Sequence, residues 1–163
     1  RIQAASSLSK AQAIRVDLHQ KNIEYELNTG IPQTSGGFKK IKVSLPVLYP
    51  NSPYSTMSFW VASGENAPEV VAANFIYKKI DFIPNVEATY PIKNTRDAFE
   101  ELKNGNAYIA AYGGSQDEIN ISNIYLAYYL GESQQEYLMP IIVFEGDKGF
   151  IAYVSAVSKE WIK

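Results

Sequence analysis

The sequence contains no cysteine and only one histidine, His19. Without thiols the chain can form no disulfide, no thiolate metal site and no cysteine nucleophile. A zinc ion would have to be held mainly by carboxylates, which is an unusual structural site. We therefore expect no metal and no cofactor. The absence of cysteine is also consistent with a protein outside the bacterial cytoplasm.

Long basic runs and long apolar runs are absent as well. Lys and Arg never form more than a pair, as at Lys39-Lys40 and Lys78-Lys79, and the formal net charge is −2. A nucleic-acid surface needs a basic stripe, so we expect no nucleic-acid partner. No apolar run reaches the roughly 18 residues of a membrane span, and no signal peptide is visible. The chain begins at Arg1 rather than Met, so we expect a processed form or an excised domain that a membrane anchor could precede.

No motif for nucleophilic catalysis is complete in this sequence. His19 falls on the solvent side of a predicted helix, and Asp17, two residues away, would not face it there. No GxSxG elbow is present, and Ser7-Leu8-Ser9-Lys10 lacks the partner motifs of an SxxK enzyme. The glycine pairs lack the strand, lysine and helix of a phosphate loop. We therefore predict no catalytic residues and a protein that is not an enzyme.

Paired acids leave one catalytic alternative open. They are Glu100-Glu101, Asp117-Glu118, and Glu145 with Asp147. A glycosidase needs two carboxylates about 5–10 Å apart across a cleft, and spacing in sequence cannot place any pair there. Calcium binding at the last two pairs lacks the spacing of an EF-hand loop. We interpret these acids as solvated side chains, with a carboxylate-based hydrolase of cell-surface polysaccharide as the alternative.

Aromatic and β-branched residues are abundant by contrast. The 163 residues include 12 Tyr and 7 Phe, a composition that favours strands. The clearest strand pattern lies in Tyr137–Val157, where apolar residues alternate on both sides of Gly146-Asp147-Lys148-Gly149. Two apolar runs around a glycine-bounded turn predict a β-hairpin, which we place in the middle of a sheet.

Two segments carry helical patterns. The first is predicted over Ser9–Gln20, because Leu8, Ala11, Ile14 and Leu18 fall on one helical face. The second is predicted over Thr95–Lys103, with Asn94 as N-cap and Gly105 as the stop. Strands are expected at residues 23–27, 38–47, 55–62, 69–82, 107–111 and 118–130, the last with a bulge at Ser122-Asn123 where its alternation changes phase.

This order predicts an α+β fold with two helices packed on antiparallel sheets. Each half of the chain contains a helix followed by strands. We interpret residues 1–85 and 86–163 as two α+β repeats of a tandem α-β-β-β-β duplication, with one continuous domain as the alternative.

The second half resembles a known family. The residues that carry the likeness are Tyr90-Pro91-Ile92, Thr95, Ala98-Phe99, Leu102, Gly105, Ile124-x-Leu126-x-Tyr128-Tyr129, Tyr137-Leu138-x-Pro140 and Phe150-x-Ala152-Tyr153-Val154. This pattern is similar to the PepSY-like domains of bacterial YycI/YycH-type proteins, with a PepSY-like or cystatin-like fold. The resemblance implies a membrane-tethered, extracytoplasmic protein that regulates two-component signalling through protein contacts, with no catalytic residues.

An aromatic cluster is the candidate partner-binding site. Tyr49 and Tyr54 flank a proline loop, and Phe59 and Trp60 lie on the strand that follows. Alternation turns Trp60 outward if Phe59 faces the core, and exposed Trp and Tyr often anchor protein partners. The alternative is that Trp60 packs inside. We predict a non-enzymatic interaction or sensor domain, with a small-ligand-binding domain as a further alternative.

Overall fold

The computed structural model describes residues 13–50, 55–63, 68–76, 78–81, 90–114 and 118–161. This part of the chain holds ten strands in three sheets but one α-helix. The prediction of two helices packed on antiparallel sheets is therefore wrong, and the protein is largely β.

Contacts divide the chain into two units, and neither is continuous in sequence. Unit 1 comprises Arg1–Gln20 and Tyr54–Glu87, and unit 2 comprises Lys21–Pro53 and Ala88–Lys163. The strands of residues 21–53, which the sequence interpretation assigned to the first repeat, thus make their contacts in unit 2.

Unit 1 contains a three-stranded antiparallel sheet. Its strands β1 (Ala13–Leu18), β5 (Met57–Ser63) and β6 (Pro68–Phe75) lie in the order β1-β5-β6. Residues that pair across an antiparallel ladder share a face. The register therefore collects one apolar face: Ile14, Val16, Leu18, Met57, Phe59, Val61, Val70, Ala73 and Phe75.

Strand β1 corrects the first predicted helix. Ile14 and Leu18 are four residues apart, which fits a helix, but Ile14, Val16 and Leu18 also alternate as in a strand. Antiparallel pairing with β5 decides between the two patterns, since Ile14 lies opposite Val61 and Val16 opposite Phe59. The start of the predicted helix, residues 9–12, lies outside the described residues.

Unit 2 contains the other two sheets. A five-stranded sheet has the order β4-β8-β9-β10-β7, from β4 (Val47–Leu48), β8 (Ile121–Tyr129), β9 (Met139–Gly146), β10 (Ile151–Ser155) and β7 (Tyr108–Ala111). The remaining pair, β2 (Ile23–Pro32) and β3 (Phe38–Leu45), forms a separate antiparallel hairpin. Pairing in the large sheet is antiparallel except between β4 and β8, which run parallel.

The predicted central hairpin is confirmed. β9 and β10 pair antiparallel between β8 and β7, joined by a short turn, Asp147–Gly149, in which Lys148 has φ 53°. Val143, Phe144 and Ala152 are fully buried. Side chains from both strands therefore fill the core on the two faces of the sheet. This hairpin therefore organises unit 2.

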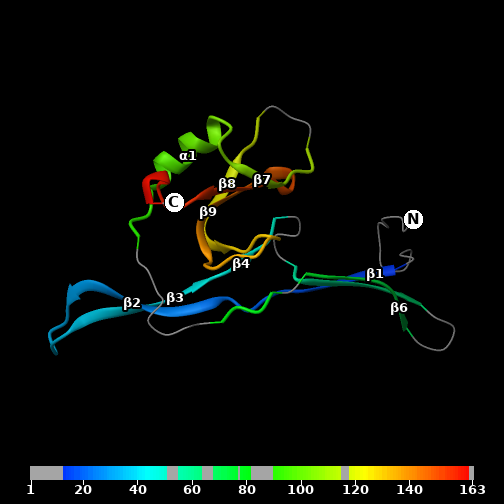
Figure 1. Cartoon of the computed structure of the whole chain (residues 1–163), viewed down its shortest axis with the longest axis horizontal. Helices are drawn as coiled ribbons and strands as arrows, with labels where there is room; N and C mark the ends of the chain where they lie inside the picture. Colours follow the sequence, from blue (N-terminus) through cyan, green and yellow to red (C-terminus); the bar gives the residue numbers. More distant parts are fainter. Residues whose placement is uncertain are drawn as a thin grey trace. The chain divides into compact units, whose positions relative to one another are not determined.

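The second predicted helix is confirmed with its bounds. Helix α1 (Thr95–Lys103) begins after Asn94, whose side chain accepts a hydrogen bond from the Asp97 backbone N–H at 2.9 Å. Fully buried Ala98 packs on the sheet in a cluster with Phe144 and Ala152. Figure 1 shows α1 covering one face of the five-stranded sheet.

Candidate functional site

The residues of the predicted aromatic cluster are divided between the two units. Tyr49 belongs to unit 2, where its side chain is 1% exposed and its carbonyl oxygen accepts a hydrogen bond from the Tyr153 hydroxyl at 3.2 Å. Phe59 and Trp60 belong to β5 in unit 1 and point to opposite faces of its sheet. Tyr54 lies outside the described residues. Tyr49 is therefore a core residue of unit 2, whereas Phe59 and Trp60 belong to unit 1.

Trp60 lies beside a network of polar groups. The Arg15 guanidinium lies 5.4 Å from the centre of the Trp60 ring, and its Nε donates to Asp17 Oδ1 at 2.8 Å. Ser55 Oγ donates to the same oxygen at 3.2 Å, and Arg15 also donates to Ser58 Oγ. Burial raises the pKa of Asp17, but hydrogen bonds from Ser58, Arg15 and Ser55 and the charge of Arg15 outweigh it and lower the pKa below its ordinary value. Asp17 is thus an ionised structural acceptor.

The other candidate acids have neighbours of their own. Glu145 accepts hydrogen bonds from the Tyr125 hydroxyl at 2.8 Å and from Asn123 Nδ2 at 3.2 Å. Asp147 accepts from Asn120, and Glu100 pairs with Lys103 on the helix surface. Nowhere in the described chain do three His or acidic side chains gather as a metal site would require.

Only one member of the acidic pair Asp117-Glu118 can be placed, because Asp117 lies outside the described residues. His19 directly follows β1 and is exposed. Its predicted place on a helix is therefore wrong.

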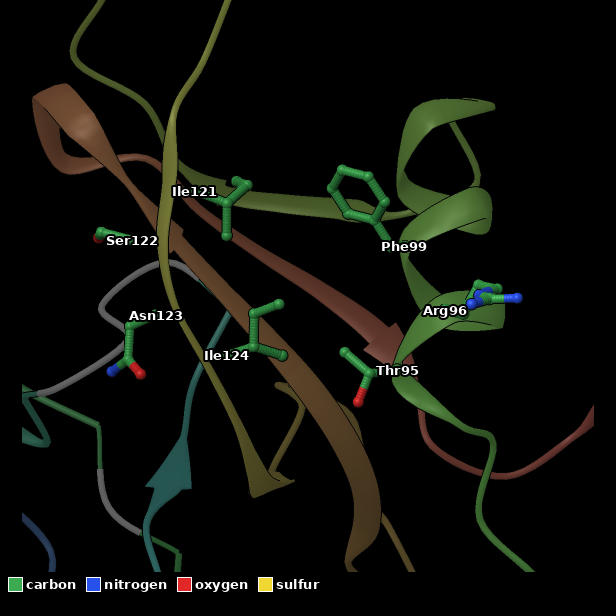
Figure 2. A pocket seen from close by; sticks show the side chains of 7 residues that line it. All are labelled: Thr95, Arg96, Phe99, Ile121, Ser122, Asn123 and Ile124. Carbon is green, nitrogen blue, oxygen red and sulfur yellow. The ribbon is translucent and has the colours of Figure 1, made fainter.

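An open groove between α1 and β8 is the better candidate site. It encloses about 490 Å³ and is lined by three residues of α1 and four of β8: Thr95, Arg96, Phe99, Ile121, Ser122, Asn123 and Ile124. Figure 2 shows Phe99 on the helix and Ile121 and Ile124 on the strand turned toward each other across this hollow. We call it the α1–β8 groove.

The groove is apolar and partly exposed. Phe99 is 38% exposed and Ile124 is 41% exposed. Phe144 lies between them, since its ring centre is 6.1 Å from that of Phe99 and it pairs with Ile124 across the β8–β9 ladder. Phe99 and Ile124 therefore flank the same fully buried side chain, that of Phe144.

The strand that borders this groove has an edge that is mostly unpaired among the described residues. β4 pairs with β8 only at Tyr128 and Tyr129, so within the described residues no strand pairs with the outer edge of β8 from Ile121 to Ala127. The last bond of this ladder runs from the Tyr128 N–H to the Pro46 carbonyl oxygen, at 2.9 Å. Pro46 has no N–H to donate to the next position, so the ladder stops there.

The alternating direction of backbone groups along a strand shows which N–H and C=O groups of β8 point to its outer edge. Neighbouring residues of a strand direct their N–H and C=O groups to opposite sides. The Tyr128 N–H points outward to Pro46, and the register contains no further bulge between Asn123 and Tyr129. The N–H and C=O of Ile124 therefore also point outward.

The sequence contained signals for parts of this site. The bulge expected at Ser122-Asn123 is confirmed as a register shift between Ile121 and Asn123. The groove itself was missed, because Phe99 and Ile124 read as ordinary core residues of a helix and a strand. The polar pair Ser122-Asn123 directly before Ile124 was a local hint in the sequence.

None of the helices among the described residues is long and apolar enough to cross a bilayer. Comparison with protein-family models, with curated proteins and with solved structures finds no match to this chain.

Proposed function

We propose that this chain is a non-enzymatic interaction domain that binds a protein partner in the α1–β8 groove. The observation that carries the proposal is that two exposed apolar side chains, Phe99 and Ile124, lie beside a strand edge that no described strand pairs with. Contiguous exposed apolar surface marks protein-interaction sites more often than single exposed residues do.

The form of the groove favours a polypeptide over a small molecule. Small-ligand pockets enclose most of the ligand surface and present a few convergent polar groups. Here the hollow is open along β8, and its facing side chains are mainly those of Phe99, Ile121 and Ile124. A partner that lies along the strand would cover these side chains without needing enclosure.

The resemblance to PepSY-like domains extends this proposal to location. A regulatory domain of that kind would act outside the cytoplasm, tethered to the membrane, and its partner would be another extracytoplasmic protein. Protease treatment of intact cells that express the full-length natural protein tests this part. Digestion of this domain in intact cells supports it, and full protection contradicts it.

Selection from a random peptide library displayed on phage tests the binding site. Selected peptides should bind the whole chain, and Phe99→Ala or Ile124→Ala should each weaken that binding about tenfold, as expected for a central contact residue. Tyr137→Ala is the matched control, because Tyr137 is 60% exposed and does not line the groove. Failure to enrich any peptide, or equal weakening by all three changes, would contradict the proposed function.

A further inference from the structure

The outer edge of β8 presents backbone groups that a further strand could satisfy. Ile124 directs its N–H and C=O outward. β4 pairs with β8 only from Tyr128 onward and so does not reach Ile124. Pro46 prevents this chain's own β4 from extending the ladder. Unpaired edges of this kind are templates for strand addition.

We infer that the partner binds as an extended segment that adds a sixth strand to this sheet, hydrogen-bonded to the β8 edge at Ile124. The inference rests on the proposed function and specifies its binding mode. Main-chain bonds would supply affinity, and side chains at every second position would supply specificity.

One face of the added strand would be apolar. Side chains on the α1 side of the sheet would lie beside Ile124, which already pairs across the ladder with Phe144. Cross-strand neighbours lie about 5 Å apart, so an apolar side chain there would cover Ile124 and border the groove. The segment should therefore carry Val, Ile, Leu or an aromatic residue at these positions.

The opposite face would favour basic residues. The carboxylate of Glu145 is drawn toward β8 on that side by the Tyr125 hydroxyl and by Asn123 Nδ2. A Lys or Arg of the added strand could extend past Asn123 toward this negative charge. Charge complementarity thus gives the segment an alternating apolar and basic pattern.

A helical occupant fits these observations less well. An amphipathic helix satisfies its own backbone and would leave the Ile124 groups unused. It would also need a groove that presents contacts at helical spacing, whereas four of the seven lining residues here are consecutive residues of one strand. The edge therefore favours an extended peptide.

N-methylation of a selected peptide tests the binding mode. Two series are made from the tightest peptide of the phage selection, with methyl groups on the odd or on the even backbone amides. One series should lose about tenfold or more in affinity, because it blocks the bonds to β8, and the other should bind nearly as well as the parent. The amide of Ile124 should exchange more slowly when the parent peptide is bound.

The outcomes separate this inference from the proposed function. Peptides that need Phe99 and Ile124 but tolerate both methylation series would overturn strand addition and leave the groove as the binding site. Protection of the Ile124 amide that rises with protein concentration, without peptide, would show that a second copy occupies the edge and would overturn the inference. A selection that yields no peptide would overturn both proposals.

Discussion

Lys93 Nζ lies 2.7 Å from Glu101 Oε1, and only 7% of the lysine side chain is exposed. The contact joins the segment before α1 to the last turn of the helix. Its geometry is not that of a hydrogen bond, and no described residue gives Nζ a hydrogen-bond partner. Glu101 is therefore the charge that compensates a nearly buried ammonium group.

Removing Glu101 should destabilise the fold by more than its surface position suggests. Glu101→Ala is expected to lower the free energy of unfolding by about 2 kcal/mol, below the range for a fully buried pair because the Glu101 side chain stays 29% exposed. Glu100→Ala is the control, since its pair with Lys103 is more than half exposed and should contribute under about 1 kcal/mol. Urea denaturation measures both changes.

The double variant Lys93→Met with Glu101→Leu tests the same pair from the other side. It removes both charges and should recover most of the stability lost by Glu101→Ala, because no buried charge is left unpaired. A double variant less stable than Glu101→Ala would contradict this account of the pair.

Asn94 should stabilise α1 as its N-cap. Asn94→Ala removes the acceptor for the Asp97 N–H and should lower the free energy of unfolding by about 1 kcal/mol. Asn94→Ser keeps an acceptor and should recover most of that loss. Asn106→Ala, an exposed asparagine beyond the helix, is the control. Thermal unfolding followed by circular dichroism distinguishes the three variants.

Asp17 should make stability depend on pH at the acidic end. Its pKa is lowered in the folded chain, so its contribution is complete above the unfolded-state value of about 3.9. That contribution is lost as the pH falls through the folded-state pKa. Asp17→Asn should therefore be less stable than the parent at pH 7, and the difference should shrink below about pH 4.

Urea denaturation at pH 7 and near pH 3 measures this difference for Asp17→Asn. Glu26→Gln is the control, because Glu26 belongs to an exposed pair with Lys40. A difference between parent and Asp17→Asn that grows as the pH falls would show that Asp17 is not stabilised in its ionised form.

Phe144 should be the most costly aromatic side chain to remove from the five-stranded sheet. It is fully buried between α1 and the sheet, and Phe144→Ala should lower the free energy of unfolding by about 3–5 kcal/mol. Phe38→Ala is the matched control on the β2–β3 hairpin, where Phe38 is 57% exposed, and should cost under about 1 kcal/mol. Similar losses for both variants would contradict the position of the core.

Local patterns predicted the elements whose signals agree with one another. Apolar alternation and a glycine-bounded turn predicted β9 and β10, and Asn94 with Gly105 predicted α1 within its bounds. The change of phase at Ser122-Asn123 predicted the bulge in β8. These features depend on neighbours in sequence, so the sequence alone specifies them.

Structural features that depend on pairing between residues far apart in the sequence were not predictable from local patterns. Ile14 and Leu18 fit both a helix and a strand, and pairing with the distant strand β5, at Val61 and Met57, selects the strand. The parallel contact of Val47 with Tyr128 likewise joins segments that no local pattern links. The open edge beside Ile124 follows from that contact and could not be inferred before it.

Amide hydrogen exchange at Ile124, measured with and without a selected peptide, tests the central proposal most directly. In the free chain the Ile124 amide should exchange much faster than those of Tyr125, which alternation directs to β9, and Tyr128, which donates to Pro46. Bound peptide should slow exchange at Ile124 to the rate of its neighbours. An Ile124 amide already as protected as those of Tyr125 and Tyr128 in the free monomer, or unchanged by a bound peptide, would contradict an open edge that receives the partner.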